Sequence, residues 1–134
     1  MITVKILIVE DDLDSREGLA RYIRACWGLP DIPLDIICVE TLAEGLNHAA
    51  SANVTFLDLE LPDSTNENTM RHIRDFQPPV IVMTGTSDTD TIASCMEHGA
   101  DSVFIKGTVI GLMPKLFETL QHDVVRKAQE RNSV

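Results

Sequence analysis

Short apolar segments alternate with amphipathic segments along the whole chain. Five of the apolar segments are rich in β-branched residues, which is typical of strands that are buried on both faces of a sheet. These predicted strands are Val4–Val9, Leu34–Val39, Val54–Leu57, Val80–Met83 and Val103–Ile105. A segment with helical spacing of its apolar residues follows each of them, so the pattern predicts five strands and five helices in alternation.

Capping residues indicate where the helices begin and end. Thr41–Glu44 (TLAE) has the usual form of a capping box, and Asp14–Glu17 (DSRE) resembles one with its aspartate in the capping position. Ser87–Asp88 is a further candidate helix start, and Gly99 suits the end of that helix. The last helix is expected from about Val109, with these residues directed toward the core: Leu112, Leu116 and Leu120.

The alternation favours an α/β fold in which a doubly wound, five-stranded parallel sheet is flanked by five helices. A chain of 134 residues is the size of one domain. We expect this domain to span residues 1–125, and residues 126–134 to form a polar C-terminal helix extension or a linker.

Composition narrows the range of partners. The chain has 11 basic and 21 acidic residues, a net charge of −10, which disfavours direct binding to nucleic acid. No apolar run approaches the length of a membrane span, so no membrane partner is expected. The three cysteines (Cys26, Cys38 and Cys95) lack metal-site spacing, and they are predicted to be core residues of a reduced, cytoplasmic protein.

Polar and charged side chains follow four of the five predicted strands. Glu10 and Asp11 follow the first strand, Asp58 the third, Thr84 the fourth and Lys106 the fifth. Because the carboxyl ends of parallel strands meet at one edge of a sheet, these side chains are expected to lie together. A cluster of carboxylates predicts a hard cation such as Mg²⁺, and an ammonium with a hydroxyl suits an anion beside it. A phosphoryl group on an aspartate fits both requirements.

Each of these features also has a purely structural interpretation. Acidic residues before a helix, such as Glu10–Asp12, often serve only as caps. Asp58 is also compatible with a loop start, Thr84 with a turn and Lys106 with a solvated side chain. The joint occurrence of all of them at matching strand ends favours a functional site.

Residues 3–123 resemble the receiver domain of two-component response regulators. The resemblance rests on four segments: Ile6–Asp12 (ILIVEDD), Phe56–Pro62 (FLDLELP), Val82–Gly85 (VMTG) and Gly99–Lys106 (GADSVFIK). It implies a flavodoxin-like sheet with strand order 2-1-3-4-5. It also implies that Asp58 accepts a phosphoryl group from a sensor histidine kinase or a histidine phosphotransfer protein.

The resemblance further implies the role of each site residue. Mg²⁺ would be held by Asp11, Asp58 and the backbone carbonyl of Glu60, with Glu10 acting mainly through water, while Thr84 and Lys106 would contact the phosphoryl oxygens. Such a domain is a signalling switch rather than an enzyme, and it catalyses only its own phosphorylation and autodephosphorylation. An output domain or a partner protein reads the switch, and a homodimer is possible in this family.

Three departures from the family pattern concern the switch rather than the chemistry. Gly107 stands where the family usually has proline, which predicts a looser loop after Lys106. Val103 stands where the family has a switching aromatic residue, and Phe104 is predicted to face the other side of the sheet. The family's glycine soon after Pro62 is missing, so this loop is expected to have a conformation of its own.

Three alternatives remain at this point. A pseudo-receiver would keep the fold as an interaction module without phosphotransfer. A Toprim-like Mg²⁺ nuclease would want an Asp-x-Asp pair, which residues 58–60 (DLE) match poorly. A haloacid-dehalogenase-like phosphatase would likewise want a second aspartate at position 60.

Overall fold

Five parallel strands form one sheet in the computed structural model, which describes residues 2–107 and 109–132. The order across the sheet is β2-β1-β3-β4-β5, so the predicted fold class and strand order are confirmed. The strands are β1 (Val4–Val9), β2 (Leu34–Val39), β3 (Val54–Asp58), β4 (Val80–Thr84) and β5 (Ser102–Ile105). In the last helix, side chains are described for residues 118 and 121–131.

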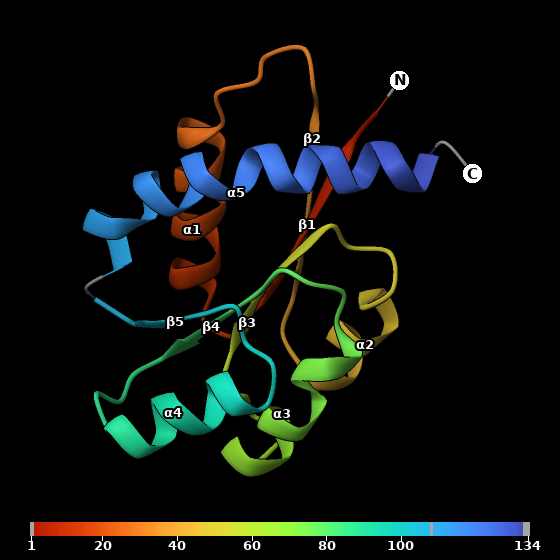
Figure 1. Ribbon diagram of the computed structural model, residues 1–134. Coiled ribbons are helices and arrows are strands. Elements are labelled where there is room, and N and C mark those ends of the chain that lie inside the picture. Colours follow the sequence, from red (N-terminus) through yellow and green to blue (C-terminus); the bar gives the residue numbers. More distant parts are fainter. Residues whose placement is uncertain (1, 108, 133–134) are drawn as a thin grey trace.

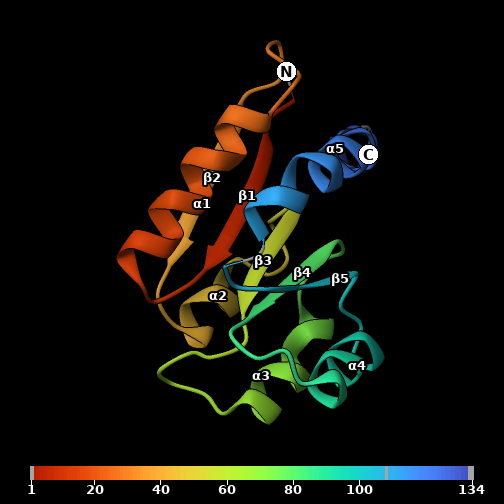
Figure 2. The same ribbon diagram turned by 90° about the vertical axis from the view of Figure 1, so that its left-hand side faces the viewer.

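Helices cover both faces of the sheet, as expected when every parallel connection crosses over it. They are α1 (Leu13–Cys26), α2 (Leu42–His48), α3 (Asn66–His72), α4 (Thr89–Glu97) and α5 (Val109–Asn132), with a 3₁₀ turn at Ile73–Asp75. Helices α1 and α5 lie on one side of the sheet, and α2, α3 and α4 lie on the other (Figures 1 and 2). The arrangement is therefore doubly wound, as predicted.

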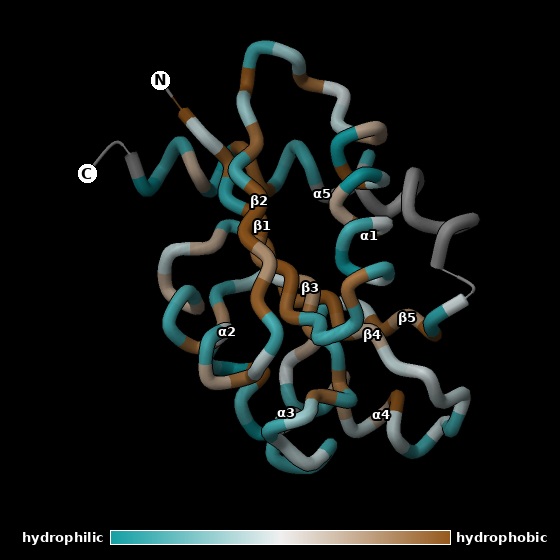
Figure 3. The backbone as a smooth tube through the Cα atoms, turned by 180° about the vertical axis from the view of Figure 1, so that it is seen from behind, coloured by the Kyte–Doolittle hydropathy of each residue, from teal (hydrophilic) through white to brown (hydrophobic). Residues whose placement is uncertain are grey.

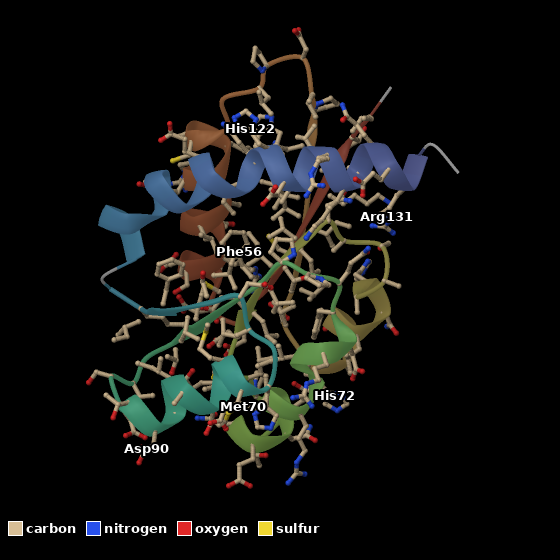
Figure 4. The ribbon with its side chains drawn as sticks, in the orientation of Figure 1. Phe56, Met70, His72, Asp90, His122 and Arg131 are labelled. Atoms are coloured by element: carbon tan, nitrogen blue, oxygen red, sulfur yellow. The ribbon has the colours of Figure 1, made fainter. Side chains whose placement is uncertain are left out.

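The central strands separate two apolar clusters. Phe56 points to the side of α1 and α5, where it packs in one cluster with Ile23 and Val124 (Figure 4). Its neighbour Leu57 points to the other side, into the cluster that includes Met70 of α3. Every residue of β3 and β4 is buried, and the strands form an apolar centre beneath more polar helices (Figure 3). The continuous apolar runs in the sequence follow from this burial on both faces.

The register of the sheet aligns the carboxyl ends of its strands. Val9 of β1 pairs with Leu57 of β3, one residue before Asp58. Asp58 pairs with Met83 of β4, and Thr84 pairs with Ile105 of β5. The residues that follow the strands therefore reach the same edge.

Two local predictions were wrong. The N-cap of α1 is Asp12, not Asp14, because the Asp12 carboxylate accepts a hydrogen bond from the Ser15 amide at 2.9 Å. Cys38 is exposed rather than part of the core, since it lies on the edge strand β2; Cys95 is buried and Cys26 is half-buried. The predicted caps at Thr41 and Asp88 are confirmed.

Residues beyond 125 continue α5 as far as Asn132. Ala128 is buried, and the Arg131 guanidinium donates a hydrogen bond to the Ala50 carbonyl at 2.8 Å near the far end of that helix (Figure 4). The predicted core positions Leu112, Leu116 and Leu120 lie outside the described side chains. Within the described residues, no helix combines the length and the apolar character needed to cross a membrane.

Candidate functional site

Three carboxylates lie together where β1 and β3 end. Glu10 and Asp11 follow β1 directly, and Asp58 is the last residue of β3. One carboxylate oxygen from each lies within 4.8 Å of the others. The side chains of Glu10 and Asp58 are almost completely buried, whereas Asp11 is exposed, so the cluster opens to solvent on the Asp11 side.

Lys106 supplies the positive charge that faces these acids. Its ammonium lies 2.8 Å from Glu10 Oε1 and 2.9 Å from Asp58 Oδ2. The Lys106 amide also donates to the Thr84 carbonyl at 2.7 Å, which continues the β4–β5 pairing just beyond the strands. The sheet register thus delivers the lysine to the carboxylates.

The pKa values follow from burial and from these contacts. Burial, and next the neighbouring Glu10 carboxylate, raise the pKa of Asp58 to about 8, although Lys106 acts in the opposite direction. Burial alone would also raise the pKa of Glu10, but its contacts with Asp58 and Lys106 outweigh burial and lower it. Burial would lower the pKa of Lys106, and the two carboxylates raise it instead. Two close carboxylates therefore share one proton when no cation is bound.

One buried oxygen in this cluster lacks a partner. Glu10 Oε2 is inaccessible to solvent, yet no hydrogen-bond donor reaches it from the described part of the chain. A buried carboxylate oxygen without a donor is costly unless a cation or a water molecule satisfies it. The carboxylates of Glu10, Asp11 and Asp58 form an all-oxygen donor set, which suits a hard divalent ion such as Mg²⁺. The residues present therefore fit the predicted metal.

Thr84 does not contact the carboxylate cluster directly. Its hydroxyl donates to Glu60 Oε1 at 3.0 Å, and the Gly85 amide donates to the same oxygen at 2.8 Å. The Glu60 amide in turn donates to Asp58 Oδ1 at 3.0 Å. Glu60 thus connects Asp58 with the end of β4 through both its backbone and its side chain.

Two residues that the sequence analysis did not single out hold the loops of the site. Arg16 donates to the Asp11 carbonyl at 3.1 Å and pairs with Glu40 at 3.0 Å, which ties the loop after β1 to the end of β2. Asp63 accepts hydrogen bonds from the Leu42 and Ala43 amides at 2.9 and 3.1 Å. The loop after β3 is therefore fixed to the N-terminus of α2. Backbone amides at the start of a helix are good hydrogen-bond donors to a carboxylate. No local sequence pattern reveals which distant loop supplies that carboxylate.

The structure shows how the chain is arranged at the two positions on and after β5 that depart from the family pattern, Val103 and Gly107. Val103 packs against the cluster on the side of α4 and Phe104 against the opposite cluster, so the predicted facing is confirmed. Gly107 adopts a φ of +91°. Proline, whose ring fixes φ near −65°, cannot take this conformation, so the backbone after Lys106 depends on glycine here.

Comparisons with known proteins agree on one family. A family model described as the response regulator receiver domain matches residues 6–120. A response regulator receiver domain from Rhodospirillum rubrum has 25% sequence identity and a TM-score of 0.71, over 87% of this chain and 94% of that one.

Two curated relatives are considerably longer than this chain. The response regulator ArlR of Staphylococcus saprophyticus is 34% identical over 76% of this chain and 45% of its own length. A cyclic di-GMP phosphodiesterase of Thermotoga maritima is 29% identical over 78% of this chain and 27% of its own length. The chain thus spans less than half the length of either relative.

Proposed function

The chain belongs to the response regulator receiver domain family, and on that premise we propose that Asp58 accepts a phosphoryl group from a phosphohistidine. Receiver domains of this family act in two-component signalling, with histidine kinases and output domains as their partners. The donor here would be a sensor histidine kinase or a histidine phosphotransfer protein. The nuclease and the dehalogenase-like phosphatase belong to other families, and no observation favours them.

The observation that carries the proposal is the contact of Lys106 with both Glu10 and Asp58, beside the unpartnered Glu10 oxygen. Phosphoryl transfer needs a positioned nucleophile and positive charge around the phosphoryl oxygens, but little other chemistry from the protein. Asp58 supplies the nucleophilic oxygen and Lys106 the charge. A bound Mg²⁺, held by Asp11, Asp58 and the Glu60 carbonyl with Glu10 nearby, would add charge on the open side.

The transfer itself is balanced. An oxygen of the Asp58 carboxylate attacks phosphorus, the P–N bond to the donor imidazole breaks, and the imidazole nitrogen keeps the electron pair and takes up a proton. Since burial raises the pKa of Asp58 to about 8 when no cation is bound, a proton on this carboxyl must leave before attack. In autodephosphorylation, a water oxygen attacks phosphorus and the P–O bond to Asp58 breaks, so that the carboxylate is restored.

Intact mass spectrometry tests the proposal. The chain is incubated with acetyl phosphate and Mg²⁺, beside the D58N variant and the control variant D90N, whose substituted carboxylate is exposed on α4. We expect one phosphoryl adduct on wild type and on D90N, and no adduct on D58N. When EDTA is present from the start, we expect no adduct on wild type either. Absence of any adduct on wild type, with acetyl phosphate and phosphoramidate alike, would instead establish a pseudo-receiver.

A further inference from the structure

The side chain of Glu60 bridges two loops of the site. Glu60 lies two residues after Asp58, and its side chain extends to the end of β4. There Glu60 Oε1 accepts hydrogen bonds from the Thr84 hydroxyl and the Gly85 amide. Glu60 itself is exposed, while Thr84 is fully buried. The contact therefore joins the loop that follows β3 to the loop that leads into α4.

The two donors that Glu60 uses are single-proton donors. A threonine hydroxyl can donate one hydrogen bond, and so can a backbone amide. The Thr84 oxygen also accepts from the Thr86 amide at 3.2 Å, which leaves its proton for Glu60. While Glu60 is in place, neither donor is free for another anion.

A phosphoryl group on Asp58 needs donors on this side of the pocket. Lys106 already faces Asp58 Oδ2, and the Glu60 amide faces Oδ1. Thr84 is the last residue of β4 and directly follows Met83, which pairs with Asp58. The Glu60 carboxylate therefore occupies donors that a phosphoryl oxygen would use.

We infer that the Glu60 carboxylate is a built-in competitor of the phosphoryl group: it occupies Thr84 and Gly85 before phosphorylation and is displaced toward solvent afterwards. The inference rests on the proposed phosphorylation of Asp58. A phosphoryl group carries more negative charge than a carboxylate and repels the Glu60 side chain. The phosphoryl oxygens therefore replace Glu60 as the acceptor of these hydrogen bonds. Because Glu60 is exposed, its side chain can leave without disturbing the core.

Displacement of Glu60 has a structural consequence. The Thr84 and Gly85 contacts tie the β3–α3 loop to the segment before Asp88, the N-cap of α4. Once Glu60 leaves, that tie is broken, and the phosphoryl group holds the end of β4 instead. Phosphorylation of Asp58 thus changes the contacts of the segment before α4. This coupling runs through the loops and does not need an aromatic side chain at position 103.

Two variants and a control test the inference. Glu60→Ala removes the competing carboxylate, whereas Glu60→Gln keeps a carbonyl acceptor of the same length without the charge. Glu67→Ala removes an exposed carboxylate from the first turn of α3, so it matches the change in net charge without touching Thr84. The probe is beryllofluoride with Mg²⁺, a stable mimic of a phosphoryl group on a carboxylate, and folding is checked by circular dichroism.

The first readout is affinity for beryllofluoride, followed by titration. Hydrogen bonds to a charged acceptor are stronger than those between neutral groups, so the Glu60 carboxylate competes effectively for its two donors. E60A frees these donors, and we expect it to bind beryllofluoride roughly three- to tenfold more tightly than wild type. E60Q should lie between them, and E67A should equal wild type. Equal or weaker binding by both Glu60 variants would overturn the inference.

The second readout is the Gly85 amide resonance in ¹H–¹⁵N spectra. We expect it to move in E60A without any ligand, and to move in wild type when beryllofluoride is added. A Gly85 resonance that stays in place in wild type at saturation shows that Glu60 is not displaced. If wild type fails to bind beryllofluoride at all, the proposed function itself fails; if it binds but the Glu60 variants do not differ from it, only this inference fails.

Discussion

Replacing Asp58 with asparagine should change how the stability of the protein depends on pH. Burial and the neighbouring Glu10 raise the pKa of Asp58 from 3.8 in its ordinary environment to about 8 in the folded chain. Between these values, without a divalent cation, the folded protein holds a proton that the unfolded chain has released. The D58N variant carries an uncharged group of the same shape and does not titrate.

The sign and size of the effect follow from proton linkage. A carboxyl group with a raised pKa contributes stability that is complete below about pH 4 and is lost as the pH rises to about 8. One proton corresponds to roughly 1.4 kcal/mol for each pH unit in this window. The free energy of unfolding of wild type should therefore fall relative to D58N as the pH rises, and level off above about pH 8.

The shifted pKa values of Glu10 and Lys106 do not affect the comparison in this window. The lowered pKa of Glu10 contributes stability that is lost only as the pH falls below its ordinary value of 4.5. The raised pKa of Lys106 contributes stability that is lost only above 10.5. Both contributions are constant from about pH 5 to about pH 8.

Urea unfolding followed by far-ultraviolet circular dichroism measures the difference. Wild type, D58N and the control D90N are unfolded in EDTA at several pH values from about 5 to 9. We expect the stability of D58N to rise relative to that of wild type up to about pH 8 and the difference to stay constant above it, while D90N runs parallel to wild type. Parallel curves for wild type and D58N would refute a buried, protonated Asp58.

Four further substitutions test the packing and the loop anchoring around the site. Gly45→Ala places a Cβ 2.8 Å from Val9 Cγ2 and should lower the unfolding free energy by about 1–2 kcal/mol, whereas Gly18→Ala, with open space around it, should raise it by about 0.5–1 kcal/mol. A loss of stability in both, measured by urea unfolding, would contradict this difference in packing. Asp63→Ala removes the acceptor of two α2 amides and should cost about 1–2 kcal/mol, and a midpoint equal to that of wild type would show that the loop is not anchored there. Gly107→Ala keeps open space but strains a φ of +91°, so it should cost about 1–2 kcal/mol and slow adduct formation from acetyl phosphate; an unchanged rate would show that Lys106 does not depend on this backbone.

The fold could be predicted because its signals are local and periodic. The run Val4–Val9 and its counterparts have the apolar, β-branched character that burial on both faces imposes, and all six residues of β1 lie in the predicted range. Placement of the acids followed from topology, since Glu10 directly follows the central strand β1 and Asp58 ends the central strand β3. The start of α1 was misplaced because Asp12 and Asp14 both precede a serine or a glutamate at capping distance, and sequence alone does not rank them.

The finer geometry of the site depends on side-chain contacts between distant segments. The sequence pointed to the Glu60 carbonyl, but the side chain of Glu60 is what meets Thr84 and Gly85. Glu60 lies beyond the end of β3, where the two-residue period of a strand no longer predicts the direction of a side chain. The contacts of Arg16 and Asp63 join loops that are far apart in sequence, and no sequence motif predicts such contacts. The positive φ of Gly107 explains why proline is absent there.

Chemical trapping of the phosphorylated residue shows whether Asp58 is the phosphoacceptor and whether it depends on Mg²⁺. The chain is treated with acetyl phosphate and Mg²⁺, reduced with borohydride, which converts an aspartyl phosphate to homoserine, and mapped by peptide mass spectrometry. We expect homoserine at position 58, and only when Mg²⁺ is present. Homoserine at Asp11 or at another carboxylate, or trapping at position 58 that does not depend on a divalent cation, would contradict this expectation.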